Sequence, residues 1–454
     1  MEKLKKEIFD KVKITRFKSA DCTDVREYAH LVKDNIWDNA INTALKEKKR
    51  VYIPNIGKEI LISSSIVMDD DCVLIVDENQ VIANTEKNGL CMVMNSRIKS
   101  GAYNAVDRSD CNKNIYVEGG IWSPNRHNDI KKFVNSDENP FMGVFTIMLF
   151  TNIENLTLRN CTFENSRSYA TEISNIKGFL IENIRFLDYK KDGIHLNGPA
   201  EYGIIKNLEG ENMLDDLVAF NAWDWDTSAT TFGTIDHVFV ENVKSNNNEF
   251  RLLPGRKTFQ NGTFVECDIK NCIFKDITGV YTYKLYCQKN WKEAFDFSYS
   301  DHSETVGNLE NIYFENIRFD KVRSDGFSEI TVNGLFDCCA DMKDIHFNNI
   351  SVDMDKAEFD KTGLKMVSVG PISYTWKRHY PDEPEKWGEL FSPDAVCKAE
   401  NITFENITFG GVKMTEIDDI MSEVHLKINP DYPKTTPKGG TGYGTVLWDI
   451  CSIE

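Results

Sequence analysis

The stretch Ile312-Tyr-Phe-Glu-Asn316-Ile-Arg-Phe319 contains the pattern that decides the fold. Apolar and polar residues alternate on each side of Asn316, which is typical of half-buried strands. An Asn at this place tolerates the left-handed backbone of a tight bend. The stretch therefore predicts two short strands that meet at a bend, each with one buried face.

The same pattern recurs along the chain from about residue 114. The other copies are Leu156-Thr-Leu-Arg-Asn160-Cys-Thr-Phe163, Leu180-Ile-Glu-Asn183-Ile-Arg-Phe186, Val238-Phe-Val-Glu-Asn242-Val, Ile273-Phe-Lys-Asp276-Ile, Ile345-His-Phe-Asn-Asn349-Ile-Ser-Val352 and Ile402-Thr-Phe-Glu-Asn406-Ile-Thr-Phe409, with Gly119-Gly120 in the corresponding place of an earlier copy. One bent unit cannot bury its own apolar face, so the copies must stack. The bend positions lie 23, 59, 34, 40, 33 and 57 residues apart, which fits one or two coils of about 20 to 30 residues with variable loops. We expect the stacked Asn side chains to form internal ladders.

The N-terminal part of the chain predicts a cap for this stack. Apolar residues at helical spacing within residues 24–48 indicate one amphipathic helix, and short apolar strands follow from Val51 onward. The sequence thus predicts an all-β, right-handed parallel β-helix with an N-terminal helical cap. A β-sandwich with similar strands is the alternative.

We expect one domain over residues 1–454. Its cap covers about residues 1–50, its coils 51–411, and a C-terminal cap 412–454. A long, aromatic, Pro-containing loop near 371–396 interrupts the coils. Such a loop either lines a binding site or packs over the flank of the coils.

Composition excludes several classes of partner. The net charge is −18, from 71 acidic and 53 basic residues, and no basic run is longer than Lys48-Lys49-Arg50, so we expect no nucleic-acid binding. No apolar run reaches about 18 residues, and the N-terminus lacks a signal peptide, so we expect no membrane span.

The 12 cysteines form no CxxC pair or zinc spacing, so we expect neither a metal nor a cofactor. Scattered cysteines suit a cytoplasmic protein, unless a secretion signal has been trimmed. A β-helix can be a monomer or a homo-oligomer.

Three aspartates stand at unusual positions. Asp192 precedes a Gly and an apolar residue, and Asp215-Asp216 precede the buried-strand pattern Leu-Val-Ala-Phe. Desolvation and mutual repulsion oppose the ionisation of such a pair. The pair follows Asp192 by 23 and 24 residues, about one coil, so the three carboxylates should be stacked neighbours. Clustered carboxylates are what acid–base cleavage of a glycosidic bond requires. An ordinary turn before a strand is the alternative.

These features together resemble a known family. The helix, the Val51-Tyr-Ile-Pro54 strand, the Asn-ended coils, Lys191-Asp192-Gly193 and Asp215-Asp216 resemble the polygalacturonase-type glycoside hydrolases, pectin-degrading enzymes with a pectin-lyase-like β-helix, over residues of about 30–410. The resemblance implies hydrolysis of a carbohydrate by inversion. It gives Asp215 the role of general acid, while Asp192 and Asp216 activate the water.

The chain departs from that family in two places. The family's Gly-His-Gly turn is absent from the corresponding region, residues 246–255. Its Arg-x-Lys strand keeps only Lys284, with Thr282 where Arg would stand. Arg251 either replaces the lost charge or pairs with an aspartate. These departures favour a neutral sugar, or a short oligosaccharide taken up into the cell, over a uronic-acid polymer.

Four residues are candidates for binding the substrate: His195, Trp223, Arg251 and Lys284. Trp223 and Trp225 form either an aromatic wall for a sugar ring or part of the coil packing. His195 either points to the cleft or is a hydrogen-bonded turn histidine.

Two other functions remain open at this point. A β-helix lyase would use a Ca²⁺ ion held by carboxylates, with Lys284 as the base. A non-catalytic carbohydrate-binding β-helix would need none of the aspartates for its activity. The Asp-Asp-apolar strand and the resemblance favour the hydrolase.

Overall fold

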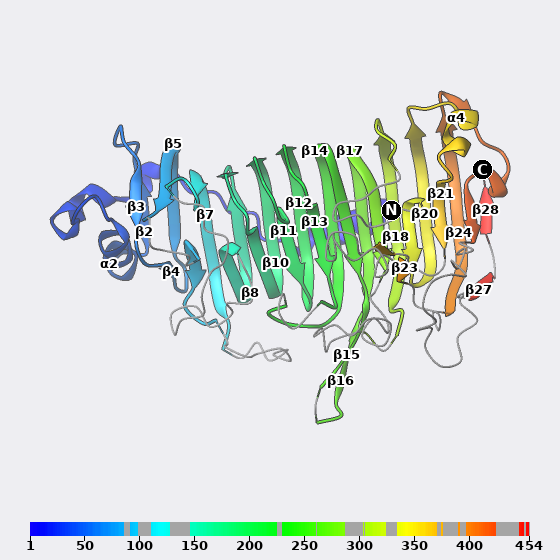
Figure 1. The fold of residues 1–454 in the computed structure, drawn as a ribbon. Helices are drawn as coiled ribbons and strands as arrows, with labels where there is room; N and C mark the ends of the chain where they lie inside the picture. The colour runs from blue at the N-terminus through cyan, green and yellow to red at the C-terminus, as the bar shows by residue number, and fades with distance from the viewer. Residues whose placement is uncertain are drawn as a thin grey trace. The chain divides into compact units, whose positions relative to one another are not determined.

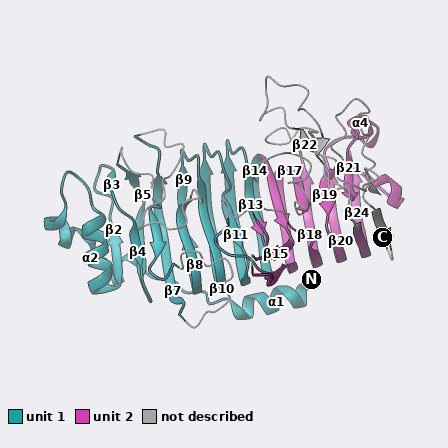
Figure 2. Ribbon diagram, turned by 60° about the horizontal axis from the view of Figure 1, so that its bottom comes forward, with its two compact units in different colours: residues 1–219, 226–232, 236–246 teal, residues 220–225, 233–235, 247–454 magenta. Residues whose placement is uncertain are grey.

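The computed structural model describes residues 1–85, 91–98, 110–127, 146–224, 229–259, 261–286, 303, 305–323, 334–369, 374–375, 389–390, 396–423, 445–448 and 451–453. These residues belong to two compact units (Figure 2). Unit 1 comprises residues 1–219, 226–232 and 236–246, and unit 2 comprises residues 220–225, 233–235 and 247–454. No helix among the described residues is long and apolar enough to cross a membrane.

Unit 1 begins with short helices. They are α1 (Glu2–Lys11), η1 (Ser19–Asp21), η2 (Val25–Leu31) and α2 (Asp38–Lys48). The prediction of one continuous helix within residues 24–48 is wrong, because a 3₁₀ helix and an α-helix divide that range. Asp34 and Asn35 separate them with positive φ values of 51° and 61°, which an α-helix cannot contain. Helix α1 packs along the later strands through Phe9, whose ring lies 5.4 Å from that of Phe239.

The strands of unit 1 form parallel rungs (Figure 1). They are β1 (Thr23–Asp24), β2 (Arg50–Ile53), β3 (Ile60–Ile62), β4 (Ile66–Met68), β5 (Val73–Asn84), β6 (Val93–Asn95), β7 (Asn112–Ser123), β8 (Thr146–Arg159), β9 (Thr162–Glu164), β10 (Tyr169–Leu187), β11 (Ile194–Asn197) and β12 (Ala200–Glu211), followed by β13 (Asp216–Asn221) and β14 (Ile235–Leu253), which continue into unit 2. In the parallel ladder, Leu156 pairs with Phe179, and Phe179 pairs with Gly203. These offsets of 23 and 24 residues are the predicted length of one coil.

Unit 2 repeats the arrangement with longer excursions between rungs. Its elements are β15 (Gly255–Thr258), β16 (Phe264–Cys267), β17 (Ile269–Tyr286), β18 (Asn308–Phe319), β19 (Gly334–Cys339), β20 (Asp341–Val352), α4 (Lys356–Lys361), β21 (Lys365–Val369), β22 (Tyr374–Thr375), β23 (Glu389–Leu390), β24 (Val396–Phe409), β25 (Val412–Lys413), η5 (Ile417–Asp419), β26 (Met421–Glu423), β27 (Thr445–Trp448) and β28 (Cys451–Ile453). Cys272 pairs with Ile312, Ile312 with Ile345, and Ile345 with Ile402, all in parallel strands. Parallel rungs in both units, with small helices at the N-terminus, confirm the parallel β-helix. Most of the expected loop at 371–396 lies outside the described residues.

Aromatic stacking and amide ladders hold the rungs in register. In unit 2 the rings of Phe274, Phe314, Phe347 and Phe404 form a buried stack with centroid separations of 5.2–5.3 Å. At the bends, Asn183 donates to Asn160 in unit 1 and Asn349 donates to Asn316 in unit 2, at 2.8 and 2.6 Å. All four have φ values of 54–58°, as the predicted bend requires. The predicted ladders exist: these two bend hydrogen bonds are exposed, whereas Asn175 donates to Asn152 in a buried one of 3.2 Å in unit 1.

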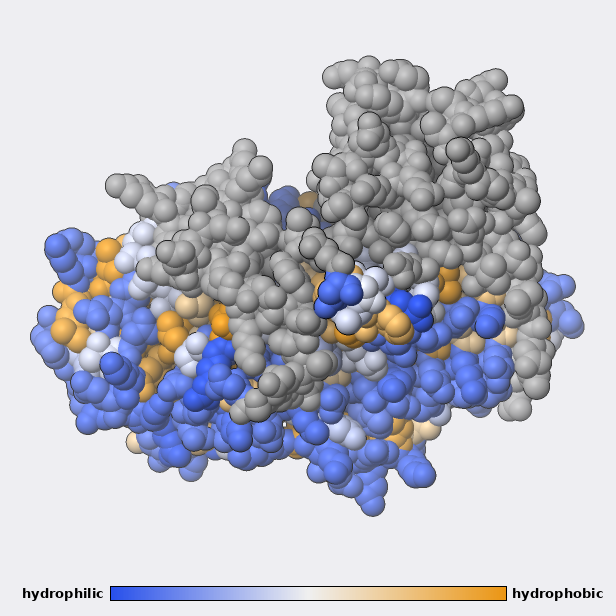
Figure 3. Space-filling view, turned by 90° about the horizontal axis from the view of Figure 1, so that it is seen from below, coloured by the Kyte–Doolittle hydropathy of each residue, from blue (hydrophilic) through white to orange (hydrophobic). Residues whose placement is uncertain are grey.

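The described surface is mainly polar. Figure 3 shows one face, on which hydrophilic residues predominate and apolar ones are scattered. Only four large apolar side chains among the described residues are counted as exposed: Ile14, Leu214, Phe264 and Val412. The other large apolar side chains lie inside the coils. Polar residues at the ends of strands are therefore the candidates for a functional site.

Candidate active site

The backbone brings the three aspartates onto adjacent rungs of unit 1. Asp192 lies two residues before β11, Asp216 is the first residue of β13, and Asp215 immediately precedes it. The amide of Gly193 donates to the carbonyl of Asp216 at 3.0 Å. A Cβ atom at Gly193 would lie 2.6 Å from the carbonyl oxygen of Leu217, so only Gly allows this approach. The Asp-Gly sequence thus positions Asp192 directly beside the next rung.

The three carboxylates form a compact buried cluster. One oxygen from each of Asp192, Asp215 and Asp216 lies within 4.8 Å of the others. Their exposed fractions are 2%, 7% and 0%. Like charges this close and this buried are costly to ionise together. The cluster confirms the one-coil stacking that the spacing predicts, and its oxygens are close enough to hold a water or a cation between them.

Two cationic or ionisable neighbours contact this cluster. Lys191 Nζ lies 3.7 Å from Asp215 Oδ2. His195 Nδ1 lies 2.7 Å from Asp192 Oδ2, and the imidazole is 1% exposed. The ring of Tyr169 stacks on that of His195 at 4.2 Å. His195 therefore fixes the orientation of Asp192 through this hydrogen bond, and its role in binding a sugar stays a prediction.

Sequence reasoning did not identify the polar residues that surround His195. Glu172 pairs in register with His195 on the neighbouring rung and is fully buried. Asn197 Oδ1 accepts from the amide of Thr230 at 3.0 Å, and the Thr230 hydroxyl donates to Ser174 at 2.6 Å. Glu172 lies 23 residues before His195, so the one-coil spacing that linked the aspartates was also the available signal for Glu172.

The other three predicted binding residues belong to unit 2. Trp223 is fully buried, so its ring presents no face to solvent, while Arg251 is half-buried on β14. Lys284 on β17 is 2% exposed and forms an ion pair with Glu249, which is fully buried. Their roles in binding a sugar stay predictions, and Trp225 lies outside the described residues.

A second polar cluster surrounds Lys284 within unit 2. The Tyr281 hydroxyl donates to Glu249. Asp337 pairs in register with Lys284 and accepts a hydrogen bond of 3.0 Å from the Ser368 hydroxyl. Glu249 and Asp337 were not among the predicted site residues, because the loops between their rungs differ in length and no fixed spacing indicates the contacts.

Comparisons with known proteins give a likeness of fold. No family model matches the chain, and no curated protein matches it. Among solved structures, the family 28 exopolygalacturonase of Yersinia enterocolitica has a TM-score of 0.45 at 11% identity, with 95% of this chain and 78% of that chain covered. The catalytic domain of a GH87 alpha-1,3-glucanase in complex with nigerose has a TM-score of 0.38 at 11% identity, covering 97% and 70%. Bacteriophage phi29 gene product 12 has a TM-score of 0.42 at 13% identity over 84% of this chain, which spans 52% of the phage chain.

Proposed function

We propose that this protein is a glycoside hydrolase whose reaction takes place at Asp192, Asp215 and Asp216. The observation that supports this proposal is the approach of three buried carboxylates to within 4.8 Å of one another. A cluster of like charges lowers stability, and acid–base cleavage of a glycosidic bond is a reaction that uses such a cluster. Hydrogen bonding to His195 holds one member, Asp192, in a fixed orientation.

In the proposed reaction, one carboxyl group protonates the leaving group and the other two activate the attacking water. Asp215, the most exposed member at 7%, donates its proton to the bridging oxygen as the bond to the anomeric carbon breaks. Asp192 and Asp216 hold a water and remove one proton from it while its oxygen bonds to the anomeric carbon. Asp215 loses one proton to the leaving group, and the pair Asp192 and Asp216 gains one proton from the water. The total charge of the three carboxylates is therefore the same before and after the reaction.

The proposal includes inversion at the anomeric carbon, because two of the three carboxylates can share one water while the third protonates the leaving group. The oxygen separation of up to 4.8 Å is shorter than the spacing of about 6.5–9.5 Å in most inverting enzymes and nearer to the value of about 5 Å in retaining ones. The stereochemistry of the product therefore tests the roles directly.

The proposed substrate is a neutral oligosaccharide. Thr282 stands where the resemblance would place an arginine, and the positive charge of Lys284 is already balanced by Glu249. Both features leave unit 2 poorly suited to gripping a sugar carboxylate through this strand.

The test is a screen of aryl glycosides and oligosaccharides, with proton NMR of the first-formed anomer. Asp215→Asn should abolish the activity found in the screen while circular dichroism shows an unchanged fold. Asp320→Asn, the same change at an exposed aspartate, is the matched control and should keep full activity. A retained anomer would overturn inversion, activity that disappears on chelation would indicate a lyase, and unchanged biological activity in Asp215→Asn would indicate a non-catalytic β-helix.

A further inference from the structure

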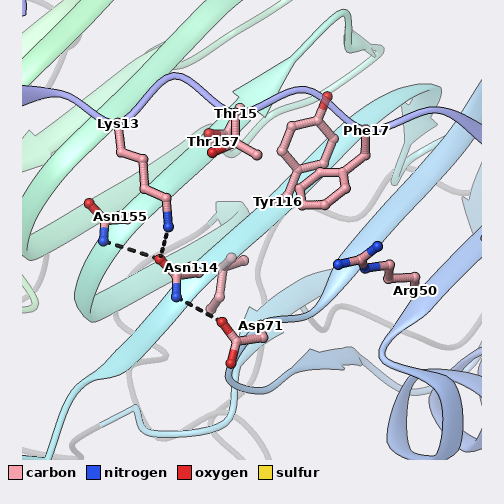
Figure 4. Close-up of a pocket in the computed structure, with 10 residues that line it drawn as sticks. Lys13, Thr15, Phe17, Arg50, Asp71, Asn114, Tyr116, Asn155 and Thr157 are labelled. Atoms are coloured by element: carbon pink, nitrogen blue, oxygen red, sulfur yellow. Dashed lines mark hydrogen bonds between the residues drawn. The ribbon is translucent and has the colours of Figure 1, made fainter. Parts of the chain in front are cut away.

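A separate cavity of about 260 Å³ lies in unit 1 under the segment that links α1 to η1 (Figure 4). We call this segment, residues 12–18, the N-terminal strap. The strap contributes Lys13 and Phe17 to the lining, and the rungs contribute Arg50, Asn114 and Tyr116. None of these residues belongs to the aspartate cluster.

Contacts along its length hold the strap in place. Arg16 forms an ion pair of 2.6 Å with Glu182, whose side chain is only 4% exposed. Val12 is buried, and the ring of Phe17 packs edge-to-face on that of Tyr116 at 5.0 Å. The cavity is therefore a preformed feature of the fold, as small-molecule sites usually are.

Two cations line the cavity, Lys13 and Arg50. Within the described part of the chain, neither Lys13 nor Arg50 forms an ion pair, whereas Arg16 on the same strap does. Lys13 Nζ donates to Asn114 Oδ1 at 3.1 Å, and the Arg50 guanidinium lies 5.0 Å above the ring of Phe17. Figure 4 shows the two side chains approaching from opposite sides of the cavity.

The cavity has a single acidic lining residue, which is engaged by the rungs. Asp71 Oδ1 accepts from Asn114 Nδ2 at 2.7 Å. The lining thus carries two positive charges and one negative charge, in a protein of net charge −18. The net negative charge of the molecule repels anions from most of its surface. The local excess of positive charge in this cavity attracts them, so an anion is favoured here over other parts of the molecule.

The remaining lining residues suit a ring with hydroxyl groups. The side chains of Thr15 and Thr157 line the cavity and offer hydroxyl donors and acceptors, as Asn114 and Asn155 offer amides. The aromatic rings of Phe17 and Tyr116 supply an apolar surface. The volume suits a molecule the size of a monosaccharide.

We propose that this cavity binds a sugar-sized organic anion, whose carboxylate or phosphate lies between Lys13 and Arg50. The ligand touches the strap through Lys13 and Phe17 and the rungs through Arg50 and Tyr116. This binding site is independent of the proposed hydrolase activity, since it uses none of the aspartates.

Isothermal titration calorimetry on the full chain tests the proposal with two anionic probes, D-glucuronate and D-glucose 6-phosphate. Either anion, or both, should bind, and D-glucose, the neutral control, should not. The probe that binds more tightly identifies the anionic group. Arg50→Gln and Lys13→Gln should each weaken binding at least about tenfold, because each removes a charged hydrogen-bond donor. Lys18→Gln changes an exposed lysine on the same strap that does not line the cavity, and it should leave affinity within about twofold.

Several results would overturn this assignment. They are the absence of binding by both anions, equal binding of D-glucose, equal binding of inorganic phosphate, and equal weakening in Lys18→Gln. Circular dichroism of each variant separates lost binding from lost fold, and Asp215→Asn should bind the anion as the unchanged protein does.

Discussion

Each unit contains a buried cluster of charged side chains, and the two clusters are built in opposite ways. In unit 1, three carboxylates lie within 4.8 Å of one another. In unit 2, the buried carboxylate of Glu249 is paired with a buried ammonium, that of Lys284. Both clusters sit on similar parallel rungs, so the fold does not dictate the difference. Like charges held together cost stability and point to chemistry, whereas an opposite pair balances its own charge.

The largest expected effect is on activity in unit 1. Asp192→Asn keeps the shape of the side chain but removes the proposed base, so kcat should fall about 10³-fold or more. The same substitution relieves repulsion in the cluster, so the free energy of unfolding should stay equal or rise. Kinetics on the substrate found in the screen, together with urea denaturation, measure both quantities. A variant that loses stability and keeps its activity would show that the cluster is structural.

The next effect is on stability in unit 2. Lys284→Met leaves Glu249 buried without its partner ammonium and should lower the free energy of unfolding by about 3–5 kcal/mol. Lys275→Met on the same strand is the control, because its partner Glu315 is 15% exposed and the expected loss is about 1 kcal/mol or less. Urea denaturation followed by circular dichroism compares them. Equal losses in the two variants would remove the contrast between the units.

A smaller effect should separate positioning from catalysis within unit 1. His195→Gln removes the imidazole that orients Asp192, and kcat should fall about 10- to 100-fold, less than in Asp192→Asn. KM should change little, since His195 is 1% exposed and acts through Asp192. A rise in KM with unchanged kcat would instead make His195 a substrate-binding residue.

The sequence predicts the contacts that depend on the coil period. Asn316 and its equivalents combine strand alternation with a residue that accepts positive φ, so both the rungs and the bends follow from the local pattern. The same period of 23 residues brings Asp192 beside Asp215. Local chemistry and a constant repeat length are sufficient for these features.

Other contacts depend on geometry that the sequence does not express. Glu249 reaches Lys284 across 35 residues, and the excursions between rungs in unit 2 vary too much for any spacing rule. The hydrogen bond from His195 to Asp192 depends on side-chain direction at a turn. The helix break at Asp34 and Asn35 interrupts an apolar periodicity that otherwise continues, so tertiary contacts override the local pattern there.

The smallest expected effect should be the same in both units, because the amide ladder does not depend on charge. Asn242→Ala and Asn349→Ala each lose one exposed ladder hydrogen bond and place Ala at a φ of 54°, so each should cost about 1–2 kcal/mol. Gly at either position accepts the same backbone and should cost less, about 1 kcal/mol. Urea denaturation of the four variants measures this. If Gly costs as much as Ala, the ladder bond rather than the backbone accounts for the preference for Asn. If the loss of unfolding free energy differs between the two units, the contribution of the bend depends on its surroundings. The units would then differ in their bends as well as in how they bury charge.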